Sequence, residues 1–527
     1  MSGDQNGPSQ KGEHRVPDLL TRAVESPRSI AWLSTGTARG PSVVAVGDDR
    51  PNQPDAFSLP AVYPEWLGDR AFLAEHPARF CYVVGEMARG IATPRMVVEA
   101  VRCGCLGFYG SAGLPLPEIK AGLDEINRAL GPDQGAWGAN LIHSPQEPGQ
   151  EAAVIDLFLA EGVRRVSASA FMRLTPDVVR YTALGLERSL DGRIRRRNHV
   201  FAKVSRAEVA EPFMSPPPEK MLRDLVASGR ISEAQAELAS KVSVAADITA
   251  EADSGGHTDN RPAFVLYSSL SAARTRMAAK HGLDESAIRI GLAGGIATPA
   301  AVAAAFQMGA AYVLTGSVNQ SAVESGLSEA GRRLLAKAGP ADVAMAPAAD
   351  MFEQGVEVQV LKRGTLFAMR GKKLHAFYKA GASYETLGAV DQKWLDDVLG
   401  EPFDQAWKAT LSYIQRVNPA EAKRAEADGN KRLALVARRY LFQGAQWARE
   451  GDPARTADYQ IWCGPAMGAF NEWVAGTPLE PAENRTVRQI ALNLLEGAAR
   501  ITRSGQLRAM GLPVPPQHFS YTPRLFE

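Results

Sequence analysis

Eight short apolar segments alternate with helix-forming segments between residues 80 and 315, and this alternation constrains the fold more than any other feature of the sequence. The first segment, residues 80–85, is apolar throughout, which is typical of a strand buried on both faces of a parallel sheet. Several segments are followed by a Thr-Pro pair, as at Thr93-Pro94 and Thr298-Pro299, and this pair is a strong helix start. Strict alternation of strands and helices predicts an α/β fold in which eight parallel strands close into a (β/α)₈ TIM barrel.

The positions of the expected elements follow from the same pattern. We expect strands at residues 80–85, 106–110, 137–142, 165–169, 199–205, 247–252, 287–293 and 311–315. We expect helices at residues 94–101, 116–130, 150–160, 219–238, 263–280 and 299–308, and one that begins at Thr175-Pro176.

The alternation stops after residue 317, and the last third of the chain is expected to be mainly helical. Helices are expected at residues 330–338, 393–418, 431–449 and 486–503, and a short hairpin at 357–362 and 366–369. A ring of strand-end loops needs a cover that excludes water, and this region could supply it. We therefore expect a disordered tail (1–15), an irregular N-terminal segment packed on the barrel (16–79), the barrel itself (80–330) and a mainly helical cap (331–515).

Composition and charge argue against two classes of partner. The 59 lysines and arginines nearly balance the 58 acidic residues, so no basic surplus predicts binding to nucleic acid or to an anionic membrane. No apolar run is long enough to cross a bilayer, and residues 1–15 lack the apolar core of a signal peptide. Four irregularly spaced cysteines favour a reducing compartment over a disulfide framework, so we expect a soluble, cytoplasmic protein.

Three glycine-containing strand ends lie between residues 250 and 317: Gly255-Gly256, Gly294-Gly295 and Gly316-Ser317. Glycine lets backbone N–H groups reach an anion with no side chain in the way, and a helix that begins just behind adds a favourable dipole. In a TIM barrel the loops after the last two strands often hold a phosphate. The second and third glycine pairs therefore predict a phosphate site.

Polar residues at other strand ends complete a candidate ligand shell together with Gly85 and Met87. Lys203 ends an apolar strand and either points into the mouth of the barrel, where it would hold a negative group, or reaches out to solvent. Asn140 could bind the edge of a heterocycle through its donor and acceptor, or cap the next helix. His257 follows Ser-Gly-Gly on a loop over the ligand, which favours a catalytic histidine over a surface or core one.

An acidic group, Glu251, Asp253 and Asp259, surrounds this histidine. The group lacks a neighbouring histidine or cysteine that would complete a ligand set, and it has too few oxygens for a hard cation. We therefore expect these residues to cap the loop and expect no metal site.

Several of these segments resemble the PfaD family of enoyl reductases, within the nitronate monooxygenase-like flavoproteins. The segments that carry the resemblance are residues 140–145, 168–171, 202–210, 251–262, 293–296, 315–317, 346–352, 359–364 and 458–468. The resemblance extends from about residue 71 to residue 512, with the cap motifs included. The family contains discrete enoyl reductases of polyunsaturated fatty acid synthases and of trans-acyltransferase polyketide synthases.

This resemblance implies bound FMN. Its phosphate would lie on Gly294, Gly295, Gly316 and Ser317, and its ring near Gly85, Met87, Asn140 and Lys203, with Gly255 and Gly256 on the loop above. A positive charge at Lys203 would stabilise the reduced flavin anion. His257 matches the active-site histidine of the superfamily. One departure is Glu86, which stands where relatives often have a small residue.

The reaction implied is the reduction of a 2-enoyl thioester on an acyl carrier protein. NADPH, as a transient co-substrate, would reduce the flavin, which would pass hydride to the β-carbon, while His257 orients the thioester or donates the α-proton. Partners would then be the carrier protein and polyketide or fatty acid synthase modules, and a homodimer is one option for the oligomeric state. The basic run at residues 193–197 is either a solvated loop or a docking patch for the acidic carrier.

Two alternatives stay open. The same fold supports nitronate oxidation, with His257 as the base, because function depends on the site and not on the fold. A non-catalytic component of a megasynthase could also have kept the barrel.

Overall fold

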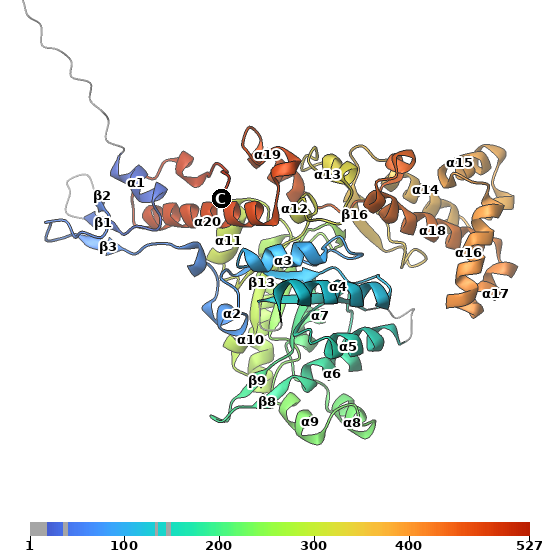
Figure 1. Cartoon of the computed structure of the whole chain (residues 1–527), viewed down its shortest axis with the longest axis horizontal. Helices are drawn as coiled ribbons and strands as arrows, with labels where there is room; N and C mark the ends of the chain where they lie inside the picture. The colour runs from blue at the N-terminus through green and yellow to red at the C-terminus, as the bar shows by residue number, and fades with distance from the viewer. Residues whose placement is uncertain (1–17, 35–40, 132–134, 144–148) are drawn as a thin grey trace, which may run out of the picture.

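The structure, a computed structural model, describes residues 18–34, 41–131, 135–143 and 149–527 of the 527-residue chain. The tail predicted at residues 1–15 lies outside the described residues. A barrel forms the centre, a helical lobe extends from it on one side, and a small sheet lies on the other side (Figure 1).

Eight parallel strands close into a barrel, so the predicted TIM-barrel fold is confirmed. They are β4 (Tyr82–Val84), β5 (Leu106–Tyr109), β6 (Trp137–Ile142), β7 (Arg165–Ser169), β10 (His199–Val204), β11 (Asp247–Glu251), β13 (Arg289–Ala293) and β14 (Val313–Thr315). Each coincides with one of the eight predicted strands. Their order around the barrel is β10-β11-β13-β14-β4-β5-β6-β7, which sets β4 opposite β10.

The helices between the strands cover the outside of the barrel (Figure 1). They are α3 (Pro94–Arg102), α4 (Leu116–Leu130), α5 (Gln150–Ala160), α6 (Pro176–Leu184), α7 (Ala207–Phe213), α8 (Glu219–Ala227), α9 (Glu233–Ala239), α10 (Ala263–His281) and α11 (Pro299–Gln307). Each predicted Thr-Pro start is a real N-cap, since the hydroxyls of Thr93, Thr175 and Thr298 accept backbone N–H bonds. The single helix predicted at residues 219–238 was wrong: the helix ends at Ser228-Gly229, and Ser232 starts a new one with a capping box.

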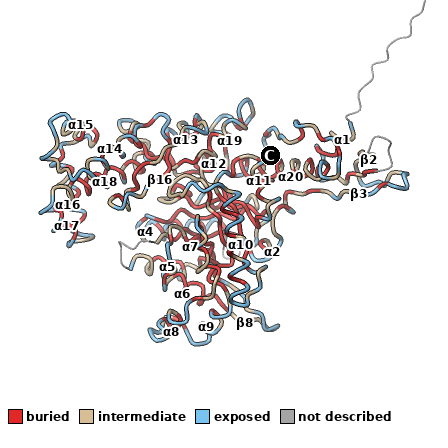
Figure 2. Tube along the Cα trace, turned by 180° about the vertical axis from the view of Figure 1, so that it is seen from behind, coloured by how far each residue is buried: buried red, intermediate tan, exposed pale blue. Residues whose placement is uncertain are grey.

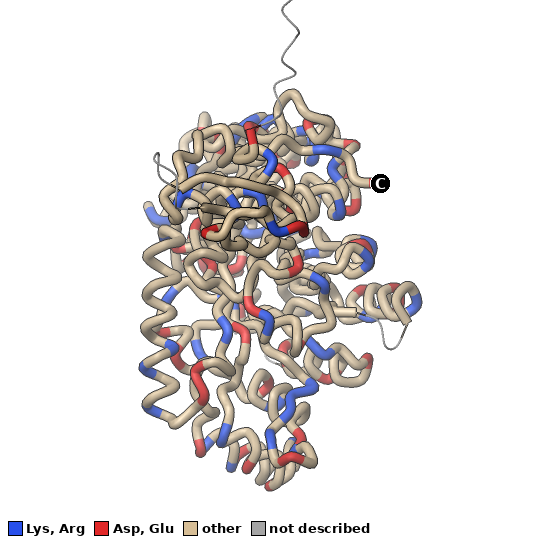
Figure 3. The backbone as a smooth tube through the Cα atoms, turned by 90° about the vertical axis from the view of Figure 1, so that its left-hand side faces the viewer, with Lys and Arg blue, Asp and Glu red and all other residues tan. Residues whose placement is uncertain are grey.

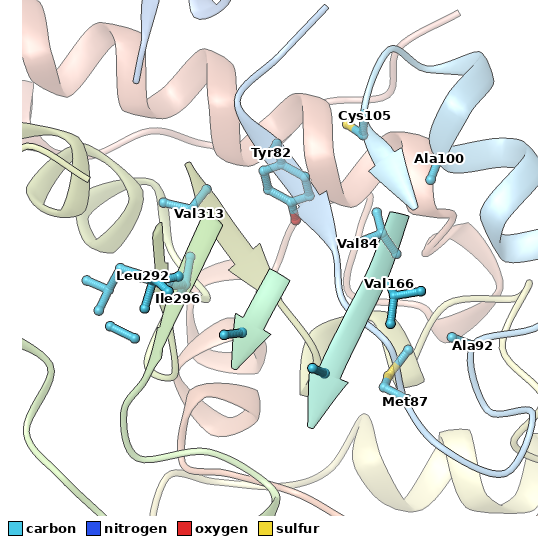
Figure 4. Close-up of a cluster of buried hydrophobic side chains, with 14 of the residues drawn as sticks. Tyr82, Val84, Met87, Ala92, Ala100, Cys105, Val166, Leu292, Ile296 and Val313 are labelled. Carbon is cyan, nitrogen blue, oxygen red and sulfur yellow. The ribbon is translucent and has the colours of Figure 1, made fainter. Parts of the chain in front are cut away.

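The barrel core is apolar. Tyr82, Val84, Val166, Leu292 and Val313 are buried side chains from four of its strands, in the cluster drawn in Figure 4. Buried residues follow the barrel strands throughout (Figure 2). Inside the barrel, Phe201 packs against Phe108 and Tyr312, and Tyr312 shares a hydrogen bond with Thr249. A filled interior leaves the two ends of the barrel for ionised groups.

The N-terminal end of the barrel, which we call the floor, is closed by a buried charged network. Arg289 binds Asp247 through two N–H groups, at 2.7 and 2.9 Å. His76, just after α2 (Arg70–Glu75), lies with Nε2 3.1 Å from Asp247 Oδ2, which also accepts from Arg289, and Arg165 Nε donates to His76 Nδ1. Burial alone would raise the pKa of Asp247, but Arg289 and His76 hold it well below its ordinary value.

A cap lobe with its own hydrophobic core follows the barrel. It contains β15 (Val343–Pro347), β16 (Glu357–Leu361), α14 (Phe367–Lys379), α15 (Ala389–Leu399), α16 (Phe403–Val417), α17 (Pro419–Ala427) and α18 (Gly429–Glu450). The hairpin predicted at residues 357–362 and 366–369 was wrong. β16 pairs instead with β15 and with β12 (Gly256–His257), while Phe367 begins a helix. The helix predicted at 393–418 is divided by Gly400 and Pro402, which end α15 and start α16.

The N-terminal segment and the last long helix of the chain pack together beside the barrel. The remaining elements are α1 (Leu19–Glu25), β1 (Ala31–Ser34), β2 (Ser42–Val46), β3 (Phe57–Leu59), α12 (Ser317–Gln320), α13 (Glu329–Leu335), α19 (Ala466–Val474) and α20 (Val487–Ala509). Helix α20 packs against α11, and its C-terminal end supports α1 and the antiparallel sheet β2-β1-β3. The domain bounds 16–79, 80–330 and 331–515 stay predictions.

The basic run at residues 193–197 lies on a hairpin of β8 (Leu186–Arg188) and β9 (Ile194–Arg196). The hairpin comes just before β10 and therefore lies at the floor, away from the strand ends that carry chemistry. Arg196 reaches inward to the carbonyls of Ser243 and Val244. Elsewhere, positive and negative residues lie interspersed (Figure 3), and no helix in the described ranges is long and apolar enough to cross a membrane.

The floor network yields a stability prediction. Asp247→Asn should lower the free energy of unfolding by about 3–5 kcal/mol, because it leaves the buried Arg289 guanidinium without a counter-charge. Denaturant unfolding followed by fluorescence measures the difference. Because the pKa of Asp247 is depressed, its contribution is complete at neutral pH and should be lost only as the pH falls below about 4.

Asp224→Asn is the matched control. It removes the partner of Lys220 in an exposed pair at 2.9 Å, and exposed pairs contribute about 1 kcal/mol or less. An equal decrease in the free energy of unfolding for the two variants would show that the floor network stabilises the protein no more than an exposed ion pair does.

Candidate active site

The C-terminal end of the barrel, its mouth, is crossed by an ion pair. Lys203 Nζ, on β10, lies 3.0 Å from Glu86 Oε1, just after β4. Because β4 and β10 stand opposite each other, this pair spans the diameter of the barrel. Lys203 Nζ also lies 3.0 Å from Oε1 of Glu251, at the end of the neighbouring strand β11.

A line of hydrogen bonds extends the pair over two further strands. Asn140 Nδ2 on β6 donates to Ser169 Oγ on β7 at 3.0 Å, and Ser169 Oγ donates to Glu86 Oε1 at 3.0 Å. We call Asn140, Ser169, Glu86, Lys203 and Glu251 the mouth network. Its five members come from five different strand ends, so only the closed barrel brings them together.

The structure decides between the alternatives for Lys203 and Asn140. Lys203 points into the mouth, where 16% of its side chain is exposed. Burial opposes its charge, but Glu251 and Glu86 raise the pKa of Lys203 above its ordinary value, so it stays an ammonium ion. Asn140 does not cap the next helix, whose N-cap is Gly149; its amide N–H groups bind Ser167 O and Ser169 Oγ.

The glycines of the three strand ends have different surroundings. A Cβ at Gly294 would lie 2.6 Å from the backbone of Ala252, and at Gly255 it would lie 2.7 Å from Cys463 N, so both positions are required by packing. Gly295 has φ +74°, and neither it nor Gly316 has an atom within 4 Å of an added Cβ. Gly295 and Gly316 therefore present bare backbone to open space, which is what approach by a phosphate requires.

The other predicted contacts lie around the same rim. Ser317 Oγ accepts a hydrogen bond from the backbone N–H of Gly464 in the returning chain, at 3.1 Å. Gly85 N–H donates to Thr315 O at 2.9 Å, which joins the strand before Glu86 to the residue before Gly316. Met87, two residues after Gly85, is buried and belongs to the apolar cluster of Figure 4.

His257 lies on β12, in the sheet shared with the cap. Gly256, with φ +84°, precedes it, and its partner strand is β16. Its Nε2 is 3.4 Å from Asp350 Oδ1, a charge contact too poorly aligned to be a hydrogen bond. Although burial alone would raise it, contact with His257 holds the pKa of Asp350 below its ordinary value.

The acidic group divides into different roles. Asp259 binds Arg206 and Ser205, and Asp253 accepts bonds from Asn260 and Gln359, so both hold the loop as expected. Glu251 also holds the loop, because it accepts from Ser254 Oγ at 3.3 Å, and it pairs with Lys203 as well.

Glu251 and Asp350 are the residues that sequence reasoning missed. Glu251 joins the mouth network, and its place at a strand end was the signal that could have shown this. Asp350 lies about 90 residues away from His257, and no local pattern pairs them.

One group in the described part of the chain has the composition of a metal site, namely His76, His199 and Asp247 at the floor. Both ring nitrogens of His76 already have partners, and the Arg289 and Arg165 guanidinium groups lie against the group. A metal ion in this group would be repelled by these two positive charges. We interpret the group as part of the floor network.

The mouth has the features of a site for a phosphorylated, ring-containing ligand. Gly295 and Gly316 leave an open backbone surface at the last two strands, and the carboxylate oxygen Glu86 Oε2 is buried with no hydrogen-bond partner. A bound ring with a donor group would satisfy that oxygen. The residues present therefore fit the flavin that the sequence implied.

Comparison with known proteins identifies the family. The crystal structure of the enoyl reductase domain of MlnA, from the macrolactin biosynthesis cluster of Bacillus amyloliquefaciens, matches this chain with a TM-score of 0.79. The match has 35% sequence identity and covers 84% of this chain and 99% of that domain. The chain belongs to the PfaD-like enoyl reductase family.

The curated relatives of this PfaD-like chain are longer proteins. It is 44% identical over 449 residues to a polyunsaturated fatty acid synthase subunit of Thraustochytrium sp., and the match covers 84% of this chain and 30% of that relative. It is 40% identical over 436 residues to the polyketide biosynthesis protein PksE of Bacillus subtilis, covering 82% and 56% respectively. The chain thus spans about half or less of the length of these relatives.

The cap matches a further family. Residues 382–459 match the inserted helical domain of [acyl-carrier-protein] S-malonyltransferase. This range contains α15, α16, α17 and α18 of the PfaD-like chain.

Proposed function

We propose that this protein is an FMN- and NADPH-dependent enoyl reductase that acts in trans on 2-enoyl thioesters of an acyl carrier protein. The observation that carries the proposal is the mouth network with its adjoining bare glycine loops, in a chain related over 84% of its length to an enoyl reductase domain. FMN, when bound, supplies hydride transfer from the nicotinamide to the double bond.

The residues of the mouth would divide the binding of the cofactor. Gly295, Gly316 and Ser317 would hold the phosphate, with Gly294 keeping the loop in its left-handed conformation. Asn140 and Lys203 would face the ring with Gly85 and Met87 at its side. Gly255 and Gly256 would determine how closely the His257 loop approaches the flavin ring.

His257 is the proposed proton-active group. It lies on the loop that follows β11 at the mouth end of the barrel, and 36% of its side chain is exposed. Asp350 would orient the ring through Nε2 and leave the other nitrogen to the substrate. Donation of the α-proton, or orientation of the thioester carbonyl, would follow.

The proposed partners are an acyl carrier protein and polyketide or polyunsaturated fatty acid synthase modules. The relatives are components of such synthases, and the cap matches a helical insert from a family whose substrate is a carrier protein. The floor position of the basic hairpin disfavours it as the docking patch, because the carrier must deliver its thioester to the mouth.

The proposal is tested by absorption spectroscopy and stopped flow. Purified protein should show a flavin spectrum, NADPH should bleach it, and an enoyl-pantetheine or enoyl-carrier substrate should restore it. Rapid bleaching with no reoxidation by any enoyl thioester would overturn the reductase activity. Oxygen uptake with nitroalkanes would favour nitronate oxidation, and colourless protein that binds no added FMN would favour a non-catalytic role.

The phosphate assignment predicts that Gly295→Val abolishes flavin binding. A branched side chain would fill the open space where the backbone is approached. Flavin occupancy after purification, and titration of apoprotein with FMN, measure the effect.

Gly282→Val separates this effect from backbone strain. Gly282 also has a positive φ, +63°, and open space around it, but it ends α10 at the floor. This variant should lose similar stability and keep its flavin. Retention of flavin by Gly295→Val would mean that the phosphate lies elsewhere.

The catalytic assignment predicts that His257→Ala keeps FMN and loses enoyl reduction by about 10²–10⁴-fold, the usual contribution of a general acid. Reduction of the flavin by NADPH should continue, because the mouth network is intact. Single-turnover reoxidation measures the loss. His281→Ala, at the exposed end of α10, is the control and should behave as the parent protein.

A further inference from the structure

Glu86 is the member of the mouth network whose presence is least explained. Only 2% of its side chain is exposed. Its Oε1 accepts from Ser169 and pairs with Lys203, whereas its Oε2 is buried without a hydrogen-bond partner. One of the two oxygens of this buried carboxylate therefore lacks a hydrogen-bond donor.

Glu86 lies at the mouth, beside the place proposed for the ligand. Glu86 stands at the centre of the mouth, since it bridges to Lys203 across the barrel. The residue before it, Gly85, is hydrogen-bonded to Thr315, and the bare backbone of Gly316 follows directly. A ligand whose phosphate lies on that loop and whose ring covers the mouth must pass over Glu86.

The charges of the network are unequal. Two acidic side chains, Glu86 and Glu251, share the single ammonium group of Lys203. Glu251 alone would be enough to balance the lysine. Glu86 is thus an additional negative charge. Without it, the ammonium group of Lys203 would favour an anion at the mouth.

A flavin changes charge when it is reduced. Hydride from a nicotinamide brings two electrons and one proton to the neutral oxidised ring, so the reduced ring carries one negative charge until it gains a second proton. A nearby ammonium group stabilises that anion, and a nearby carboxylate destabilises it.

We propose that Glu86 contacts the flavin ring through Oε2 and lowers the reduction potential of the cofactor by offsetting the charge of Lys203. This inference rests on the proposed function, because it requires bound FMN. A ring N–H, which the oxidised flavin carries between two carbonyls, is a donor that Oε2 can accept. The more negative potential makes the reduced cofactor a stronger hydride donor toward an enoyl thioester.

The experiment measures the potential of the holoprotein by titration with dithionite in the presence of a reference dye. Glu86→Gln removes the charge and keeps the shape; Glu86→Ala removes both and serves if the amide variant folds poorly. Both should shift the flavin potential to a more positive value. Reduced FMN should then bind roughly tenfold or more tightly, relative to oxidised FMN, than in the parent protein, as expected for the loss of one opposing charge-assisted contact.

Glu421→Gln is the matched control. Glu421 is also a buried glutamate paired with a lysine, Lys431, at 2.8 Å, but it belongs to α17 in the cap. Its substitution should leave the potential unchanged, even if it costs stability.

The outcomes separate this inference from the proposed function. A flavin that binds with an unchanged potential in both Glu86 variants would overturn the inference and leave the reductase proposal standing. A shift to a more negative potential would overturn it as well. A parent protein that binds no flavin would overturn both.

Discussion

Closure of the eight-stranded sheet is the constraint on which the rest of the structure depends. A closed parallel barrel has no free edge, and its interior is filled by apolar side chains, so ionisable groups can enter only at its two ends. The chain places one charged network at each end. Asp247 and Arg289 lie at the start of neighbouring strands, and Lys203 and Glu86 lie at the end of opposite strands.

The two networks differ in a way that separates stability from function. At the floor, each carboxylate oxygen of Asp247 and both ring nitrogens of His76 have a partner, so the charge of the buried acid is compensated within the protein. His199 Nδ1 has none, but burial lowers the pKa of His199 and so disfavours a charge on its ring. At the mouth, Glu86 Oε2 has none, and two acids share one lysine. A protein keeps such an imbalance where a ligand completes it, which is why the mouth, and not the floor, is the candidate active site.

Much of the barrel could be predicted from the sequence because its signals are local. A buried strand is an apolar run, and three of the helices that follow start at a Thr-Pro pair, so a unit can be recognised within about 20 residues. The predictions failed where structure depends on distant partners. Residues 357–361 do form a strand, but β16 pairs with β15 and with β12, which lies in the loop after barrel strand β11, and not with the residues that follow it.

The site was predictable to a similar degree. Glycine positions and the inward lysine follow from strand ends, whereas the partners of Lys203 depend on which strands face each other after closure. Asp350 could not be found, because its approach to His257 requires the cap sheet to be assembled.

That dependence on the cap also assigns the proposed catalytic group and the proposed cofactor contacts to different parts of the chain. The glycine loops at Gly295 and Gly316 and the mouth network belong to the barrel and its strand ends. His257, in contrast, is held in a three-stranded sheet with β16 and β15, and Gly255 packs on the backbone of Cys463 in the returning chain. The cap therefore holds the loop of His257, because β12 is a strand of the cap sheet. A cap that shifts relative to the barrel would move His257 and Asp350 together, while the mouth network, which lies on barrel strand ends, would keep its geometry.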